Sequence, residues 1–178
     1  MKIIKLLDLI YPPVCGICSK GKNVYLCKKC EKILQIKAVF GSEKYEDKYF
    51  SNHMYIFKYD GIIRELILKY KFNEKPYLYK IFTNFLEKFK KNNLNLEKYD
   101  IIVVVPISKK RKKERGYNQS EWIAMGISDF TGKDIDRYLI HRCGTSETQT
   151  NKGIYKRWEN TQNIFALGNT SDAEGKHL

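Results

Sequence analysis

Four cysteines near the start of this 178-residue sequence have the spacing of metal ligands. Cys15 and Cys18 form one C-x-x-C pair, and Cys27 and Cys30 form a second pair after eight intervening residues. Each pair can place two thiolates on one tight turn, and two such turns complete the tetrahedral sulfur shell that zinc prefers. Because four protein ligands leave no position for a substrate or water, we predict a structural zinc ion.

Two other uses of these cysteines are two disulfide bonds and a thioredoxin-like redox pair. The redox interpretation is disfavoured because no strand-helix-strand pattern follows either pair. Lys5 and Asp8 interrupt the first apolar stretch, no small-residue cleavage site follows it, and no segment is long enough to span a bilayer. We therefore predict a cytoplasmic protein without a membrane span, in which cysteines stay reduced. Cys143 has no partner motif and is interpreted as an ordinary thiol.

The chain is strongly basic, with 33 Lys and Arg residues, 20 Asp and Glu residues and a formal charge of +13. Such a charge is compatible with a surface that binds polyanions, including single-stranded DNA. Six of the 33 cations are arginines, which leaves 27 lysines scattered through every segment, so compositional bias is the alternative interpretation. The arginines are more informative, because a guanidinium group can bind a phosphate through two parallel hydrogen bonds.

A run of six Lys and Arg residues at positions 109–115 lies between a predicted buried strand and a predicted helix. Backbone N–H groups and a helix N-terminus favour anions at such a position. Arg111 and Arg115 would add bidentate contacts, and Asn118 and Gln119 would add orienting hydrogen bonds. We predict that these four residues bind phosphate; a solvated loop without a ligand is the alternative.

The elements that must position these residues alternate between helices and strands. Apolar spacing predicts a short helix within residues 1–10 and another over 28–36, in which Ile33, Leu34 and Ile36 are available for packing. Residues 41–50 are polar and are expected to link two parts of the chain. A strand is predicted over 53–59, and helical spacing follows over 62–72.

The second half of the chain begins with a helix predicted to start at Pro76. Residues 101–105, IIVVV, lack alternation and indicate a central parallel strand that is covered on both faces. A basic loop is expected over 107–116 and a helix over 118–130. Further strands are predicted at 135–140, 163–167 and 174–178.

This order of strands and helices is typical of an α/β protein with a parallel sheet, in which ligands bind beyond the carboxyl ends of the strands. The segment from Pro106 to Gln119 would occupy such a position. We expect a zinc-binding head over residues 1–40 and an α/β domain over residues 52–178. His53 and His141 have no partnered carboxylate or cysteine, so the sequence offers no catalytic base or nucleophile.

Several motifs along the chain together form a recognisable pattern. The most specific is RGYNQ at 115–119, which follows a strand that ends in proline, and PPVCGICSK at 12–20 and LCKKC at 26–30 precede it. The pattern also includes Tyr59, Gly61, Ile67, Lys71, Phe72, Arg111, Arg142, Thr145, Gln149, Arg157, Asn160 and Phe165. Over essentially its whole length the sequence resembles the ComF (competence protein F) family of phosphoribosyltransferase-like proteins, which commonly carry an N-terminal four-cysteine zinc module.

The resemblance implies a type I phosphoribosyltransferase fold, a nucleotide or ribose-phosphate ligand, and a role in competence and DNA uptake. Arg142, Gln149, Arg157 and Asn160 are then candidate ligand contacts, with ordinary capping and salt bridges in a surface loop as the alternative. Through the zinc head, the protein would dock a helicase or another part of the DNA-uptake machinery. A non-catalytic adaptor that binds single-stranded DNA or such a helicase is the alternative function.

The sequence departs from the family at its carboxyl end. The resemblance implies a further hydrophobic strand, an acidic pair and a Thr- and Gly-rich loop that binds phosphoribosyl diphosphate, and none of these occurs before Leu178. We therefore expect an incomplete phosphoribosyltransferase-like sheet without transferase activity, from a truncated product or a partial sequence. A chain that is completed by a partner is the second interpretation.

Overall fold

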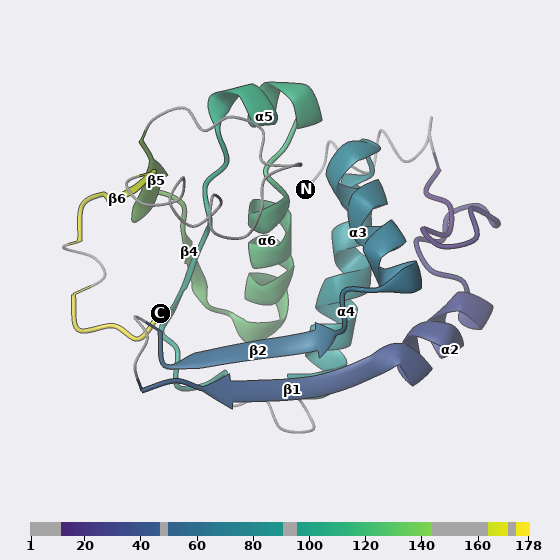
Figure 1. Ribbon diagram of the computed structural model, residues 1–178, viewed down its shortest axis with the longest axis horizontal. Helices are drawn as coiled ribbons and strands as arrows, with labels where there is room; N and C mark the ends of the chain where they lie inside the picture. Colours follow the sequence, from purple (N-terminus) through teal and green to yellow (C-terminus); the bar gives the residue numbers. More distant parts are fainter. Residues whose placement is uncertain (1–11, 47–49, 91–95, 144–163, 171–173) are drawn as a thin grey trace. The chain divides into compact units, whose positions relative to one another are not determined.

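The computed structural model describes residues 12–46, 50–90, 96–143, 164–170 and 174–178 (Figure 1). The chain divides into two compact units, Met1–Leu86 and Glu87–Leu178, which are described separately. The helix predicted within residues 1–10 lies outside the described residues. No helix in the described part of the chain is long and apolar enough to cross a membrane. The expected division into residues 1–40 and 52–178 stays a prediction.

Among its described residues, the first unit combines three α-helices and one 3-10 turn with one β-hairpin. Its elements are α2 (Lys28–Lys37), β1 (Ala38–Lys44), β2 (Asn52–Phe57), α3 (Gly61–Phe72), the 3-10 turn η1 (Pro76–Leu78) and α4 (Tyr79–Lys90), the last of which continues past the division between the units. The predicted strand at 53–59 and helix at 62–72 are confirmed as β2 and α3. The helix that was predicted to start at Pro76 is also confirmed, as η1 followed directly by α4.

The core of the first unit consists of apolar side chains from the helices. Its buried members include Leu34, Ile63, Leu66, Tyr70, Leu78, Ile81 and Phe85. The ring of Phe57 on β2 meets the ring of Phe85 edge to face, with 5.2 Å between centroids. This contact packs the hairpin against α4 within the same core.

Helix α2 is confirmed, but one of its predicted packing residues is wrong. Leu34 is fully buried, whereas Ile36 is 83% exposed. Each residue advances about 100° around a helix, so Ile36 lies roughly 200° from Leu34, on the opposite side. The buried stripe of α2 instead joins Cys30 to Leu34, which are four residues apart.

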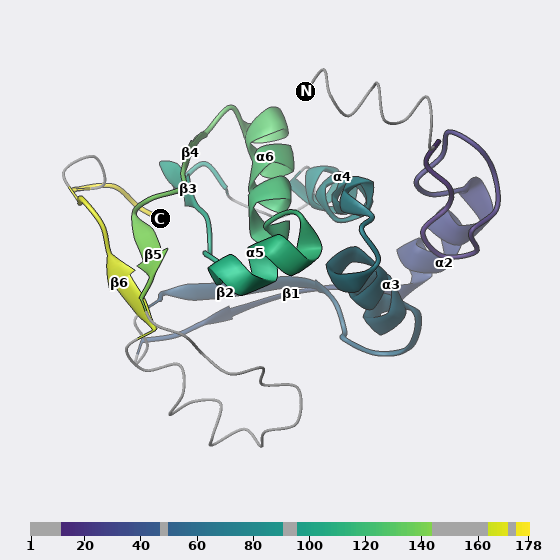
Figure 2. The same ribbon diagram turned by 90° about the horizontal axis from the view of Figure 1, so that it is seen from above.

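The prediction of a polar linker over 41–50 is wrong in its first part, because residues up to Lys44 belong to β1. This strand pairs antiparallel with β2 in a register that places Ser42 opposite Met54, and the two ribbons lie side by side in both views (Figures 1 and 2). Ser42 Oγ donates to Asn52 Oδ1 over 2.8 Å. Gly41 leaves the space that the Tyr55 ring occupies. Strand formation here depends on the partner strand rather than on local apolar alternation.

The second unit contains short strands around helix α6. Its elements are β3 (Ile101–Val103), α5 (Lys109–Arg115), α6 (Gln119–Thr131), β4 (Asp134–Asp136), β5 (Ile140–Arg142) and β6 (Phe165–Leu167). Strands β3 and β4 pair in parallel, and β5 and β6 pair antiparallel. Among the described residues of this unit, the buried apolar side chains include Ile101, Val104, Ala124, Leu139 and Ile164.

The fold is mixed α/β, but the predicted phosphoribosyltransferase-like parallel sheet is not confirmed. Each sheet among the described residues has two strands, and only the β3–β4 pair is parallel. The expectation that residues 101–105 form one strand covered on both faces is wrong, because β3 ends at Val103 and Val105 is 55% exposed. The chain leaves the sheet at this point and turns into α5.

Two further strand predictions require correction. Residues 135–140 do not form one strand, because Asp136 Oδ1 accepts hydrogen bonds from the backbone N–H groups of Tyr138 (2.7 Å) and Leu139 (2.8 Å). This side-chain turn ends β4, and β5 begins only at Ile140. The segment 174–178 is not a strand, although His177 O accepts from Asp100 N–H over 2.8 Å. The strand predicted at 163–167 is confirmed over Phe165–Leu167.

The basic segment at 107–116 is helical over most of its length rather than a loop. Ser108 caps α5, because its Oγ accepts a hydrogen bond from Arg111 N–H over 3.2 Å. Lys110 and Glu114 form an i, i+4 ion pair at 4.0 Å, and Lys, Arg and Glu are good helix formers. Gly116 ends the helix in the left-handed conformation with a φ of 74°.

The burial difference within α2 yields a matched test of the first unit's core. Replacing Leu34, which is fully buried, with Ala should lower the free energy of unfolding by about 2–5 kcal/mol. Replacing the exposed Ile36 with Ala should change it by less than about 0.5 kcal/mol. Urea unfolding followed by circular dichroism measures both values, and equal losses for the two variants would contradict this packing.

Candidate metal centre

The first cysteine pair lies in a loop that folds back on itself before α2. Cys15 N–H donates to Lys20 O over 3.2 Å, and Gly16 N–H donates to Tyr25 O over 3.0 Å. Gly21 has a φ of 87°, a left-handed conformation that suits glycine and allows the chain to reverse. The loop thereby returns toward its own start just before the second pair.

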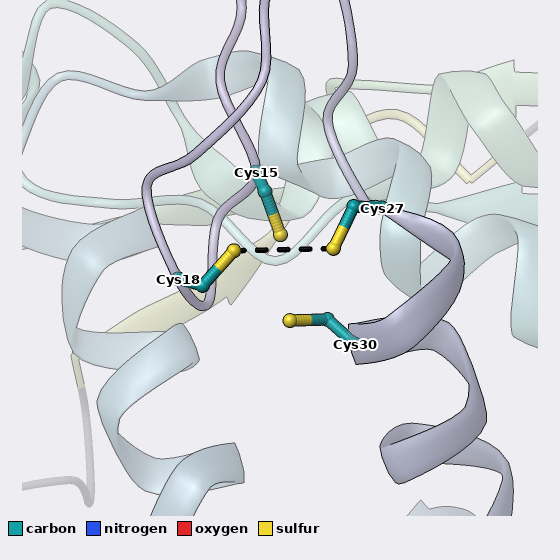
Figure 3. Close-up of side chains that lie close together, drawn as sticks. All are labelled: Cys15, Cys18, Cys27 and Cys30. Atoms are coloured by element: carbon teal, nitrogen blue, oxygen red, sulfur yellow. Dashed lines mark hydrogen bonds between the residues drawn. The ribbon is translucent and has the colours of Figure 1, made fainter.

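The second pair lies at the beginning of α2, where Cys27 is the N-cap residue and Cys30 belongs to the first turn. All four sulfur atoms lie within 4.8 Å of one another, and their side chains point to a common centre (Figure 3). Cys18 Sγ and Cys27 Sγ are 3.9 Å apart. Four sulfurs at zinc-ligand distance of about 2.3 Å in a tetrahedron would be about 3.8 Å from one another. The donor set and its spacing therefore fit a metal ion with four thiolate ligands.

The four thiols have different surroundings. None of them is in a disulfide; Cys15 and Cys30 are buried, whereas Cys18 is exposed. Burial acts to raise the pKa of Cys15, but backbone hydrogen bonds from Cys27, Cys18 and Ile17 prevail and lower it to about 6. Burial and the neighbouring thiols raise the pKa of Cys30 to about 12. Ionisation of one thiol therefore disfavours ionisation of the next, and a bound cation would offset this repulsion between thiolates.

The cysteine loop packs closely against the helices of the first unit. A Cβ atom on Gly16 would lie 2.5 Å from Leu78 Cδ2 and 3.0 Å from Leu66 Cδ1, so a larger residue here would have to displace these leucine side chains. Asn84 of α4 donates to Tyr25 Oη over 2.6 Å. The candidate metal centre is therefore built into the first unit rather than appended to it.

Lys69 of α3 is a further residue at this centre that sequence reasoning did not single out. Its ammonium group donates to Gly16 O over 3.0 Å and to Ile17 O over 3.1 Å. Both carbonyls lie between the first two cysteines. More than fifty residues separate Lys69 from them, and the chain contains many other lysines, so no local pattern could have indicated this contact.

In the second unit, the structure brings the predicted phosphate-binding residues together at the start of α6. Asn118 is the N-cap: its Oδ1 accepts from Ser120 N–H over 3.1 Å, and its Nδ2 donates to Val105 O over 3.1 Å. Arg115 Nη1 donates to Gln119 Oε1 over 3.2 Å. Asn118 and Gln119 are both buried, and their amides join the segment after β3 and the end of α5 to the start of α6.

Arg111, Arg115 and Arg142 form what we call the arginine cluster. Burial lowers the pKa of Arg115, and the charge of Arg111 lowers it further, against the opposing effect of Glu114. Burial and the same Arg111 charge lower the pKa of Arg142. The Arg142 guanidinium also lies over the Phe165 ring, 5.6 Å from its centroid. Like charges are thus gathered in one region of the second unit.

Five further residues were considered from the sequence. Gln149, Arg157 and Asn160 lie outside the described residues. His53 of β2 and His141 of β5 are both exposed. Within the described ranges, the four cysteines are the only group of three or more His, Cys, Asp or Glu side chains arranged to hold a metal ion.

Comparison with known proteins bears on the family. The chain is similar to competence protein ComFC of Bacillus subtilis (strain 168), with 24% identity over 113 residues. This similarity supports a distant relationship to the ComF family. The match spans 62% of this chain and 43% of ComFC, so it covers less than half of that relative. No family model matches the sequence, and no solved structure matches it. The family resemblance predicted from the sequence is confirmed. The link to competence rests on the similarity to ComFC, which is a competence protein.

Substitution of single cysteines tests the metal centre of this ComF relative. Cys30→Ser removes a buried ligand, so we expect the purified protein to lose most of its metal, whereas wild type should hold about one ion per chain. Cys143→Ser is the matched control, because Cys143 is exposed and lies in the other unit. Elemental analysis by mass spectrometry measures the number of metal ions bound per chain. Full metal content in Cys30→Ser would contradict the assignment.

Proposed function

We propose that this chain is a ComF-type protein that acts in competence and DNA uptake, with a structural zinc ion in its first unit and a phosphate-binding surface in its second. Similarity to a competence protein supports the process, and four converging sulfur atoms support zinc, since thiolate sets of this kind favour that metal. The ion would stabilise the first unit without taking part in chemistry. A cytoplasmic location would keep its ligands reduced.

The observation that carries the proposed ligand surface is the arginine cluster, whose member Arg115 contacts Gln119 at the start of α6. This helix has thirteen residues, and its first backbone N–H groups favour an anion. Arg115 is held in place by Gln119, and a bound phosphate would offset the repulsion that Arg111 exerts on Arg115 and Arg142. A nucleotide or ribose-phosphate compound has the negative charge for such a surface. The phosphoribosyltransferase relationship remains part of this proposal.

Replacing Arg115 tests this surface directly. Arg115→Met should weaken binding of phosphoribosyl diphosphate or a nucleotide by about 10- to 100-fold, since hydrogen bonds to charged groups contribute about 1.5–3 kcal/mol. Arg137→Met is the matched control, because it removes the same charge from a side chain that pairs with Glu121 at 2.6 Å. Isothermal titration calorimetry measures both affinities. Equal affinities in the two variants, or no binding by wild type, would contradict the proposal.

A second candidate function is supported by the lysines of α5. Lys109, Lys110, Lys112 and Lys113 are all exposed. A short helix that presents four ammonium groups to solvent is suited to the phosphates of single-stranded DNA, where each contact releases a counterion. In this case the protein would act as a non-catalytic adaptor, with the zinc-containing unit docking a helicase of the uptake machinery.

The salt dependence of DNA binding separates the two functions. If α5 binds single-stranded DNA, replacing both Lys112 and Lys113 with Gln should reduce the slope of log affinity against log salt by about 1.4, at about 0.7 for each phosphate contact. Fluorescence anisotropy with a labelled oligonucleotide measures this slope. Wild-type binding that is absent, or a slope unchanged in the double variant, would exclude the adaptor role for α5.

A further inference from the structure

The contact between Lys69 and the cysteine loop joins α3 to the backbone around the first two sulfur ligands. Lys69 is half-buried, and its ammonium group donates to the carbonyls of Gly16 and Ile17 over 3.0 and 3.1 Å. The Gly16 carbonyl shares a peptide group with Ile17 N–H, and the Ile17 carbonyl shares one with Cys18 N–H. In a planar trans peptide the carbonyl and the N–H point in opposite directions. The two N–H groups therefore point away from Lys69.

Those same two N–H groups hydrogen-bond to the sulfur of Cys15. A positive charge at the carbonyl end of a peptide group increases the polarisation of its N–H, and linked hydrogen bonds strengthen one another in this way. A continuous chain of hydrogen bonds, linked through the two peptide groups, thus runs from the Lys69 ammonium on α3 to the sulfur of the buried Cys15. Tetrathiolate zinc also carries a net charge of −2, which a nearby ammonium offsets.

We propose that Lys69 is a positioning residue for the metal centre: it fixes and polarises the two peptide groups that hydrogen-bond to the Cys15 ligand. This inference rests on the zinc centre proposed above. Packing supports the same arrangement, since Gly16 lies directly against Leu66 and Leu78 and keeps the loop at the surface of α3. Metal affinity is therefore set in part by a residue outside the four-cysteine motif.

The test compares zinc affinity in two variants of the same helix, using the full chain. Lys69→Met keeps most of the length of the side chain but removes its charge and its donors. Arg64→Met removes one positive charge from an exposed position of α3 and is the matched control. Competition with a chelator of known zinc affinity should show a loss of about 10- to 100-fold for Lys69→Met, as is typical of outer-shell partners, and less than about twofold for Arg64→Met.

Rescue separates a specific role from a general loss of packing. Lys69→Arg restores a cationic donor and should recover most of the affinity. If Lys69→Met loses its helical circular dichroism even with zinc present, Lys69→Gln, which retains N–H donors without the charge, takes its place and should show a loss above that of Arg64→Met. Affinity equal to that of Arg64→Met in the folded variant, or no rescue by Lys69→Arg, would overturn the proposal.

Wild-type protein is titrated first with zinc and with cobalt, whose absorption spectrum reports tetrahedral thiolate ligation. Binding of about one ion with that spectrum supports the centre on which this role depends. A wild-type chain that binds neither metal would overturn the zinc centre itself and with it the role of Lys69. Normal wild-type binding with an unaffected Lys69→Met variant would overturn only the role of Lys69.

Discussion

Four sulfur atoms in the first unit lie within 4.8 Å of one another, and two of the cysteines that carry them are buried. Thiolates at this spacing repel one another: burial and the neighbouring thiols raise the pKa of Cys30, whereas backbone hydrogen bonds lower the pKa of Cys15. A bound divalent cation would remove this repulsion and would at the same time join the loop before α2 to the first turn of α2. Because Gly16 packs against Leu66 and Leu78, the centre also determines how the loop meets the helical core.

Local sequence patterns predicted the features that depend on nearby residues. The doubled C-x-x-C spacing located the metal ligands, and helical spacing located α3, α4 and α6. The helix predicted over 118–130 is confirmed as α6, which Asn118 caps at its start and Gly132 ends. Features that depend on distant partners could not be predicted. Strand β1 requires β2, and the Lys69 contact spans more than fifty residues. The side chain of Asp136 divides a segment whose apolar content indicated one strand.

The second unit gathers positive charge by two different structural means. In α5, a serine cap and an i, i+4 ion pair stabilise a helix whose lysines remain in solvent. In the arginine cluster, partial burial and mutual repulsion disfavour the charged form of the guanidinium groups, and a bound anion would stabilise that charged form. A flexible, solvated lysine suits a polymer of phosphates, and a fixed arginine suits one small phosphate ligand. The two proposed functions therefore depend on different residues and can be separated experimentally.

X-ray absorption spectroscopy at the zinc edge, on the full chain purified under reducing conditions, tests the central claim most directly. Our account predicts four sulfur neighbours at about 2.3 Å, with no nitrogen or oxygen in the first shell. Nitrogen or oxygen neighbours at about 2.0–2.1 Å, or a reduced protein that holds no zinc, would contradict the four-cysteine centre.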